Sequence, residues 1–348
     1  MDIEFNEMNY LSNPDLVILK ADYEQFLLSI TGPTVIDIKG KDSSRCRVIN
    51  TLLHGNEPSG LIAVHRWLTE EFKLPVPETN IRIIICSVEA ASVRPLFSTR
   101  YVKDGKDLNR CFGSDQETDY YRRANLIEQA IRDVAPEAIV DLHNTSGYGP
   151  PFAVSPSITT DGLSLASFFC QTMILSSIHL GALMELDFGC PVVTIECGGS
   201  HDEQSHEVAF EGIQHIATCP DINYFHQEKS VDVIYRPLRL QIKPGIELSY
   251  SEHDEGYEGV TLKSNIEQFN YGSACQGQML GWLDENGLDN LQLLDDAKEN
   301  VIEEYFCTRD SQLVCAVHVR IFMATTIKNI AQNDCLFYVV KVPPGDTF

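Results

Sequence analysis

Basic residues are scarce in this chain of 348 residues. Lysine and arginine number 26 against 50 aspartates and glutamates, which gives a formal net charge of −24. From Val134 to Gln227 the sequence contains neither lysine nor arginine. A surface this negative repels phosphate backbones and anionic lipid headgroups. We therefore expect neither a nucleic acid nor a membrane surface as partner.

The sequence also lacks the marks of an exported protein. Its eleven cysteines are an odd number, none forms a Cys-x-x-Cys pair, and several lie within apolar runs, such as Cys86 and Cys315. Buried thiols of this kind are typical of a reduced, cytosolic protein. The segment Met1 to Phe5 is acidic and has no basic and apolar regions like those of a signal peptide. We expect a cytoplasmic protein.

One stretch, Gly162 to Met184, carries no formal charge and is long enough to span a bilayer. Serine, threonine, glutamine and histidine residues interrupt it, which favours a largely buried helix of a soluble domain over a lipid-facing one.

The first two thirds of the chain alternate short β-branched runs with amphipathic segments of helical length. This alternation is typical of an α/β sheet covered by helices. The expected strands are 34–38, 47–53, 81–86, 138–142 and 192–195. The expected helices are 60–72, 118–134 and the uncharged stretch 162–184.

After about Asn223 the pattern changes to short alternating runs separated by turn residues. These runs are 238–242, 314–322 and 335–342, and an acidic segment, 291–305, is expected to form a helix between them. We predict two domains, a catalytic α/β domain over 1–228 and a smaller β-rich domain over 229–348.

The residues that suggest chemistry follow three of the expected strands. His54 is the only one of ten histidines with a glutamate three residues on, Glu57, and it follows a largely apolar run. His143 and Glu196 each follow a β-branched run. In open α/β sheets, ligands bind beyond the carboxyl ends of the strands. A catalytic zinc site typically takes three imidazole or carboxylate ligands and leaves a fourth position open. His54, Glu57 and His143 supply that set, and Glu196 is the candidate base.

Each of these signals also has a structural alternative. A His-x-x-Glu spacing is more often solvated or structural in a random sequence, and a lone histidine such as His143 is more often a hydrogen-bonded residue at a strand end. Glu196 would be costly to bury without a partner, so a salt bridge is the alternative to a site carboxylate.

At these residues the chain resembles the succinylglutamate desuccinylase and aspartoacylase family, a branch of the zinc-carboxypeptidase fold. The resemblance spans roughly residues 46 to 200. It rests on segments in the family's order and at similar spacings: His54-Gly55-Asn56-Glu57, Thr99-Arg100-Tyr101, Asp107-Leu108-Asn109-Arg110, Asp141-Leu142-His143-Asn144 and Ile195-Glu196.

The resemblance implies a zinc-carboxypeptidase-like mixed sheet flanked by helices, and it implies roles for single residues. One zinc ion would be held by His54, Glu57 and His143, and Glu196 would be the general acid and base. Arg100 would polarise the scissile carbonyl. Asn109 and Arg110 would hold the α-carboxylate of the substrate, a task that suits a planar guanidinium.

Two features bear on the substrate. Tyr148 lies just past a predicted ligand and either contacts substrate or packs as a turn aromatic. Aspartoacylases carry a further arginine between the second histidine ligand and the catalytic glutamate, and this chain has none there. The substrate is therefore expected to be less acidic than N-acetylaspartate, unless Lys229 or Arg236 takes that role.

The leading hypothesis is a zinc-dependent amidohydrolase that cleaves an N-acyl amino acid, or a similar small amide, with metal-activated water. A metallocarboxypeptidase acting on short peptides is the second hypothesis. The third is a non-catalytic binding protein on the same fold. The sequence leaves homo-oligomerisation open, and other divalent ions can occupy sites of this ligand type.

Overall fold

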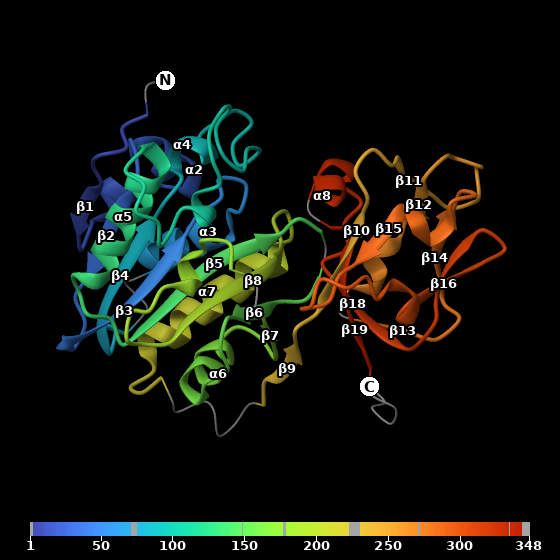
Figure 1. The fold of residues 1–348 in the computed structure, drawn as a ribbon. Coiled ribbons are helices and arrows are strands. Elements are labelled where there is room, and N and C mark those ends of the chain that lie inside the picture. Colours follow the sequence, from blue (N-terminus) through green and yellow to red (C-terminus); the bar gives the residue numbers. More distant parts are fainter. Residues whose placement is uncertain are drawn as a thin grey trace. The chain divides into compact units, whose positions relative to one another are not determined.

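A computed structural model describes residues 3–70, 75–147, 149–176, 179–222, 230–270, 272–333 and 335–342. The chain divides into two compact units, Met1–Asn144 with Pro151–Val233, and Thr145–Pro150 with Ile234–Phe348 (Figure 1). The domain boundary predicted between residues 228 and 229 lies outside the described residues.

The first unit contains a mixed sheet in the order β1-β2-β4-β3-β5-β8-β6-β7-β9. Parallel pairing joins β3 to both β4 and β5, while β2 runs antiparallel to β4 and β6 antiparallel to β8. The strands are β1 (Asn9–Ser12), β2 (Thr34–Ile38), β3 (Asp42–Thr51), β4 (Thr79–Ile85), β5 (Ala138–Thr145), β6 (Phe152–Ser155), β7 (Thr172–Leu175), β8 (Val192–Gly199) and β9 (Asp232–Tyr235).

Helices flank this sheet. They are α1 (Leu16–Leu19), α2 (Tyr23–Ser29), α3 (Ser59–Thr69), α4 (Val88–Ala91), α5 (Asp119–Arg132), α6 (Thr160–Ala166) and α7 (Glu203–Thr218), with 3-10 turns η2 (Leu108–Arg110) and η3 (Leu183–Glu185). None of the helices in the described ranges is long and apolar enough to cross a membrane.

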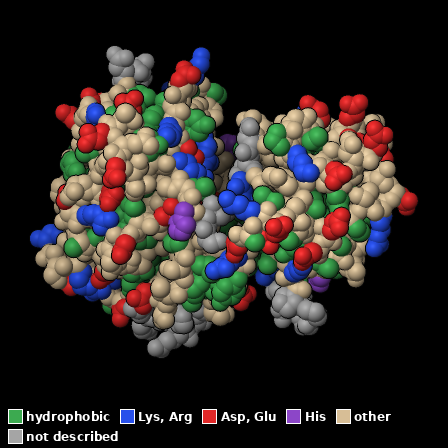
Figure 2. Space-filling view, viewed as in Figure 1, with side chains coloured by type: hydrophobic (Ala, Val, Ile, Leu, Met, Phe, Trp, Pro, Cys, Tyr) green, Lys and Arg blue, Asp and Glu red, His purple; other side chains and the backbone are tan. Residues whose placement is uncertain are grey.

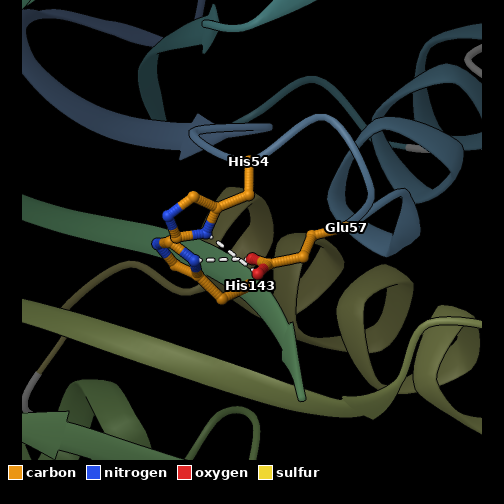
Figure 3. Close-up of side chains that lie close together, drawn as sticks. All are labelled: His54, Glu57 and His143. Carbon is orange, nitrogen blue, oxygen red and sulfur yellow. Dashed lines mark hydrogen bonds and ion pairs between the residues drawn. The ribbon is translucent and has the colours of Figure 1, made fainter. Parts of the chain in front are cut away.

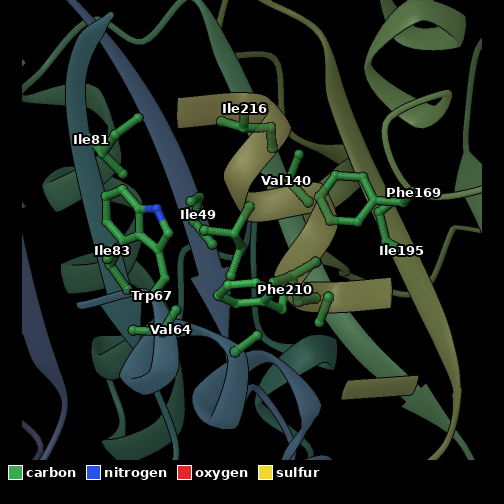
Figure 4. Packing of buried hydrophobic residues seen from close by; sticks show 14 of the residues in the cluster. Ile49, Val64, Trp67, Ile81, Ile83, Val140, Phe169, Ile195, Phe210 and Ile216 are labelled. Carbon is green, nitrogen blue, oxygen red and sulfur yellow. The ribbon is translucent and has the colours of Figure 1, made fainter. Parts of the chain in front are cut away.

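Alternate residues of the strands face two separate cores. On β5, Ala138, Val140 and Leu142 pack with residues of α2, α3, α6 and α7, and Figure 4 shows Val140 among other residues of this core. The intervening Ile139 joins the core beneath α5. Because side chains alternate along a strand, His143 lies on the same face as Ile139. This periodicity determines which face of the sheet carries the candidate site.

The second unit is β-rich, as predicted. Two five-stranded sheets, β13-β18-β19-β10-β15 and β11-β12-β14-β17-β16, contribute to one apolar core. The strands are β10 (Leu238–Ile242), β11 (Leu248–Ser251), β12 (Val260–Lys263), β13 (Ser273–Ala274), β14 (Met279–Leu283), β15 (Leu291–Leu293), β16 (Phe306–Arg309), β17 (Gln312–Cys315), β18 (Val319–Phe322) and β19 (Phe337–Lys341). The unit also contains η5 (Ile266–Phe269), η6 (Gly287–Asn290), η7 (Ile302–Glu304) and α8 (Lys328–Asn333).

The structure confirms the predicted fold class of a mixed sheet flanked by helices with a second, β-rich unit. The prediction of a single buried helix over 162–184 was wrong, because this stretch forms α6, the strand β7 and the turn η3. The acidic helix predicted over 291–305 was also wrong. That segment contains β15 and one 3-10 turn, η7.

Acidic side chains are spread over the visible surface of each unit, with lysines and arginines between them (Figure 2). On the face that Figure 2 shows, the acidic side chains do not gather in one patch.

Candidate metal centre

Three side chains predicted as metal ligands converge in the first unit. His54 follows β3, Glu57 precedes α3, and His143 lies on β5, and all three are almost fully buried. Their candidate ligand atoms lie within 4.8 Å of one another. Figure 3 shows both imidazole rings directed at the carboxylate of Glu57. Two imidazoles and a carboxylate in this arrangement form a typical ligand set for zinc.

Local backbone features direct His54 into the site. The chain leaves β3 at Thr51, and Leu52 has a φ of 60°, a left-handed conformation that turns the backbone sharply. Gly55 then packs so closely on α4 that a Cβ atom would lie 2.5 Å from the backbone nitrogen of Ala91. The predicted strand 47–53 therefore ends two residues early because the chain turns toward the site.

Each histidine contacts Glu57 through Nδ1 and a second carboxylate through Nε2. In His143, Nδ1 lies 2.7 Å from Oε2 of Glu57 and Nε2 lies 2.8 Å from Oδ2 of Asp141. In His54, Nδ1 lies 2.9 Å from Oε1 of Glu57 and Nε2 lies 2.8 Å from Oδ1 of Asp107. A carboxylate that accepts the Nε2 proton leaves the Nδ1 lone pair free for a metal, which is the usual arrangement behind histidine ligands.

Nδ1 of His54 and Oε1 of Glu57 are close, but their geometry is not that of a hydrogen bond. Nδ1 of His54 is buried and has no hydrogen-bond partner among the described residues. A buried polar atom without a partner is costly, and a bound cation would satisfy it. The donor set and this atom both fit a divalent metal ion.

Charged neighbours shift the pKa values of Glu57 and His143 in opposite directions. Burial alone would raise the pKa of Glu57, but His54 and His143 outweigh it and hold that pKa well below its ordinary value. Burial alone would lower the pKa of His143, but Asp141 and Glu57 outweigh it and raise that pKa well above its ordinary value. In the metal-free protein a proton on His143 therefore balances the charge that a metal ion would otherwise balance.

Glu196 lies on β8, next to β5 in the sheet, and on the same face as His143 by the alternation of side chains. The residue keeps some exposed surface, but its Oε2 atom is buried without a hydrogen-bond partner among the described residues. Burial raises the pKa of Glu196 to about 7, aided by Glu57 and opposed by His143, His54 and Arg100. A carboxyl group with such a pKa can both accept and donate a proton near neutral pH.

Arg100 is brought to the same cluster. Its Nη1 lies 3.1 Å from Oε1 of Glu57, and its Nη2 lies 2.9 Å from Nε2 of His54 and 3.1 Å from Oδ2 of Asp107. A guanidinium can only donate, so Nε2 of His54 cannot donate to Asp107 and accept from Arg100 at once. Only the tautomer that donates to Asp107 leaves Nδ1 free for a metal.

The two residues predicted to bind the substrate carboxylate, Asn109 and Arg110, make their hydrogen bonds elsewhere than to the metal cluster. Asn109 is buried in η2, where its Oδ1 accepts a hydrogen bond from the backbone of Leu183 at 3.0 Å. Arg110 is exposed, and its Nη1 donates to the backbone oxygen of Asn109 at 2.7 Å. No hydrogen bond or ion pair within the described ranges joins either residue to the three clustered ligands. Tyr148 lies outside the described residues.

Two carboxylates of the site were not assigned a role from the sequence. Asp141 lies two residues before His143 on one strand, so the period of two places both side chains on one face, and this signal was available. Asp107 reaches His54 from 53 positions away in the sequence. Only the fold reveals that contact.

Comparison with solved structures identifies the class of fold. A succinylglutamate desuccinylase from Vibrio parahaemolyticus has a TM-score of 0.58 at 14% identity over 93% of this chain and 96% of its own. A succinylglutamate desuccinylase/aspartoacylase from Rhodobacter sphaeroides has a TM-score of 0.55 at 14% identity over 88% of each chain. Murine aminoacylase 3 has a TM-score of 0.52 at 14% identity over 87% of this chain and 98% of its own. At such identities the likeness shows the fold alone, and it confirms the zinc-carboxypeptidase-like fold.

A family model matches the part of the sequence that contains the candidate site. Residues 48–161 match the model of the succinylglutamate desuccinylase/aspartoacylase catalytic domain, and this segment contains His54, Glu57 and His143. The resemblance to this family expected from the sequence is thereby confirmed. No curated protein matches the chain.

Proposed function

We propose that the protein is a zinc-dependent amidohydrolase that cleaves the amide bond of an N-acyl amino acid or a similar small amide. The observation that carries the proposal is the buried cluster of His54, Glu57 and His143 with the titratable carboxyl group of Glu196 on the same face of the sheet. The match to a deacylase family and the amide hydrolases among the similar structures support this reaction class.

In this proposal His54, Glu57 and His143 hold one zinc ion. When bound, zinc would polarise the scissile carbonyl and lower the pKa of water. Glu196 takes a proton from the attacking water as its oxygen bonds to the acyl carbon. Glu196 then returns that proton to the amide nitrogen as the carbon–nitrogen bond breaks. The products are a carboxylic acid and a free amine.

Arg100 is the proposed electrophile for the scissile carbonyl, because its guanidinium contacts both Glu57 and His54. Asn109 and Arg110 are proposed to bind the α-carboxylate of the substrate. Asp107 supports this assignment, because it contacts Arg100 and His54 and, as the N-cap of η2, lies two residues before Asn109.

The amino acid in the substrate is proposed to carry a side chain less acidic than that of aspartate. Lysine and arginine are absent from 134 to 227, so this segment supplies no cation for a second carboxylate. Of the two substitutes considered from the sequence, Lys229 lies outside the described residues. Arg236 pairs with Asp296, with Nη1 3.1 Å from Oδ2.

Metal analysis and hydrolysis assays test the proposal. Protein purified without chelators should contain close to one zinc per chain, and it should hydrolyse N-acetyl-leucine faster than N-acetylaspartate. The variant Glu196→Gln should retain zinc and lose most activity, by about 10² to 10⁴-fold, since it cannot accept a proton. The control Glu211→Gln, an exposed glutamate of α7, should behave as wild type. Full activity of Glu196→Gln, or release of C-terminal residues from dipeptides with N-acyl amino acids left intact, would contradict the proposal.

A further inference from the structure

Asn144 directly follows His143 on β5, and both ends of its buried side chain are hydrogen-bonded. Its Oδ1 accepts the backbone N–H of Ser59 at 3.0 Å. Its Nδ2 donates to Oγ of Ser59 at 2.7 Å and to the backbone oxygen of Gly198 at 2.9 Å. One amide side chain therefore joins β5 to the start of α3 and to the end of β8.

These partners are close in sequence to the functional residues. Ser59 is two positions after Glu57, and Gly198 is two positions after Glu196. The backbone N–H of Asn144 also donates to Oε2 of Glu57 at 3.3 Å. Asn144 is thus the residue through which three separate segments, each with a proposed functional side chain, are hydrogen-bonded together.

The bond to Ser59 also caps a helix. The N-terminal N–H groups of a helix have no partner within the helix, and the capping residue of α3, Pro58, makes no side-chain hydrogen bond. Oδ1 of Asn144 satisfies one of these groups from a neighbouring strand. The start of α3, and with it Glu57, is therefore positioned by β5 and not by a cap in its own sequence.

A second contact extends this network. Oγ of Ser59 lies 2.8 Å from Nδ1 of His206 on α7. Because Nδ2 of Asn144 donates to that Oγ, the hydroxyl proton is free to donate to the imidazole. Every polar atom of the Asn144 side chain is thus used within the protein, which leaves no atom of it for a substrate.

We propose that Asn144 is a positioning residue that holds Glu57 and Glu196 in place relative to His143, and thereby sets both the zinc affinity and the catalytic rate. The inference rests on the proposed function. Catalytic groups must be held within about 0.5 Å of their productive geometry, and hydrogen bonds behind the ligands provide that constraint. Loss of such outer partners typically costs 10–100-fold in metal affinity or activity.

The test compares Asn144→Ala with a matched control, Asn290→Ala. Asn290 is equally buried, in the second unit, and its Nδ2 donates to Oδ1 of Asp284 and to the backbone oxygen of Gly259. Zinc affinity is measured by competition with a chromophoric chelator, and coordination geometry by the visible spectrum of the cobalt-loaded protein. Hydrolysis of N-acetyl-leucine at saturating zinc gives kcat and KM.

Asn144→Ala should bind zinc 10–100-fold more weakly, change the cobalt spectrum, and lower kcat with KM unchanged. Asn290→Ala should lose thermal stability and keep wild-type zinc affinity, spectrum and kcat. If Asn144→Ala does not fold, Ser59→Ala decides the question. It removes only one of the three side-chain bonds, so it should bind zinc with an affinity between those of wild type and Asn144→Ala.

Equal zinc affinity and spectrum in the Asn144 or Ser59 variant and in wild type would overturn the inference alone. A wild-type protein that does not bind zinc would overturn both the inference and the proposed function. Tight zinc binding by wild type that weakens in Asn144→Ala, without hydrolysis of any amide, would support the positioning role and overturn the proposed function.

Discussion

Nε2 of His143 lies 2.8 Å from Oδ2 of Asp141, and this contact selects which imidazole nitrogen carries the proton. The network continues behind it. Oδ1 of Asp141 accepts from Nδ2 of Asn50 at 2.6 Å, and Oδ1 of Asn50 accepts from Sγ of Cys86 at 3.0 Å. Asn50 and Asp141 are register partners on β3 and β5, which explains why their side chains meet. The candidate ligand His143 is thus held by a buried chain of side chains from β5 through β3 to Cys86, which directly follows β4.

The first prediction concerns this chain. Asp141→Asn replaces the Nε2 acceptor with an amide that can present its NH₂ group instead, so the tautomer with a free Nδ1 is no longer favoured. Zinc affinity should fall by 10–100-fold. Chelator competition measures it. Asp37→Asn, which breaks an ion pair with Arg82 on the same sheet, is the control and should leave zinc affinity unchanged. Wild-type affinity in Asp141→Asn would contradict the orienting role.

The second prediction separates metal binding from catalysis. The positive charge of Arg100, with Nη1 3.1 Å from Oε1 of Glu57, would oppose the binding of a cation by that carboxylate. Arg100→Ala should therefore bind zinc more tightly, although the partial exposure of Arg100 limits the gain to a few-fold. The same variant should lose about 10²-fold or more in kcat, because an electrostatic contact to the carbonyl is removed.

Calorimetry for zinc and steady-state kinetics measure the two effects of Arg100→Ala. Arg66→Ala is the control, since Arg66 lies on the outside of α3 and pairs with Glu70 and Glu207. It should change neither quantity. Weaker zinc binding in Arg100→Ala would show that the arginine supports the ligand Glu57 more than it repels the metal.

The third prediction concerns the zinc-free protein. Folding raises the pKa of Glu196 from 4.5 to about 7 and raises that of His143 well above 6.5. At any pH between the unfolded and the folded pKa of either group, the folded protein therefore keeps a proton that the unfolded chain has released. Stability falls with rising pH wherever the folded state binds more protons. The free energy of unfolding should be lower at pH 8 than at pH 5, and Glu196 accounts for at most about 3 kcal/mol of the difference.

Urea unfolding of the zinc-free protein at a series of pH values checks this. Glu196→Gln cannot titrate at that position, so its stability should fall less steeply with pH than that of wild type. The exposed control Glu211→Gln should follow the wild-type slope. A zinc-free protein whose stability rises from pH 5 to pH 8 would show that the carboxyl group is not buried in the protonated form.

Much of the first unit could be predicted because its strands are buried and strongly patterned. The strand 34–38 matches β2 at both ends, and 138–142 and 192–195 match the starts of β5 and β8. The last two strands run on through His143 and Glu196, polar residues that the apolar pattern excludes. Both residues belong to the candidate site, so an apolar pattern does not predict that the strands continue through them.

The failures have physical causes too. The stretch 162–184 has no charge to mark its turns, and the composition of a buried helix does not differ from that of α6 followed by a buried strand. The three candidate ligands could be proposed from the sequence because they lie in contiguous motifs, and the fold brings them together. Asp107 and Asn144 also lie in segments that carry the family resemblance, but their contacts with His54, Ser59 and Gly198 are created only by the folded chain.

The last prediction concerns how closely α3 approaches the sheet. Gly60 is the second residue of α3, and a Cβ atom there would lie 2.0 Å from Oγ1 of Thr51 and 3.0 Å from Cβ of Leu142. Gly60→Ala must therefore push the start of α3 away from β3 and β5. The overpacking should cost about 1–3 kcal/mol of stability.

Because Glu57 lies three residues before Gly60, the same displacement should weaken zinc binding more than the loss of stability alone explains. Urea unfolding and chelator competition, each on Gly60→Ala, measure the two effects. Gly32→Ala is the control, since the nearest atom to a Cβ there is 3.8 Å away. Unchanged zinc affinity in a destabilised Gly60→Ala protein would mean that the loop of His54 and Glu57 keeps its geometry independently of α3, and the contact between Asn144 and Ser59 would then not transmit position to the ligands.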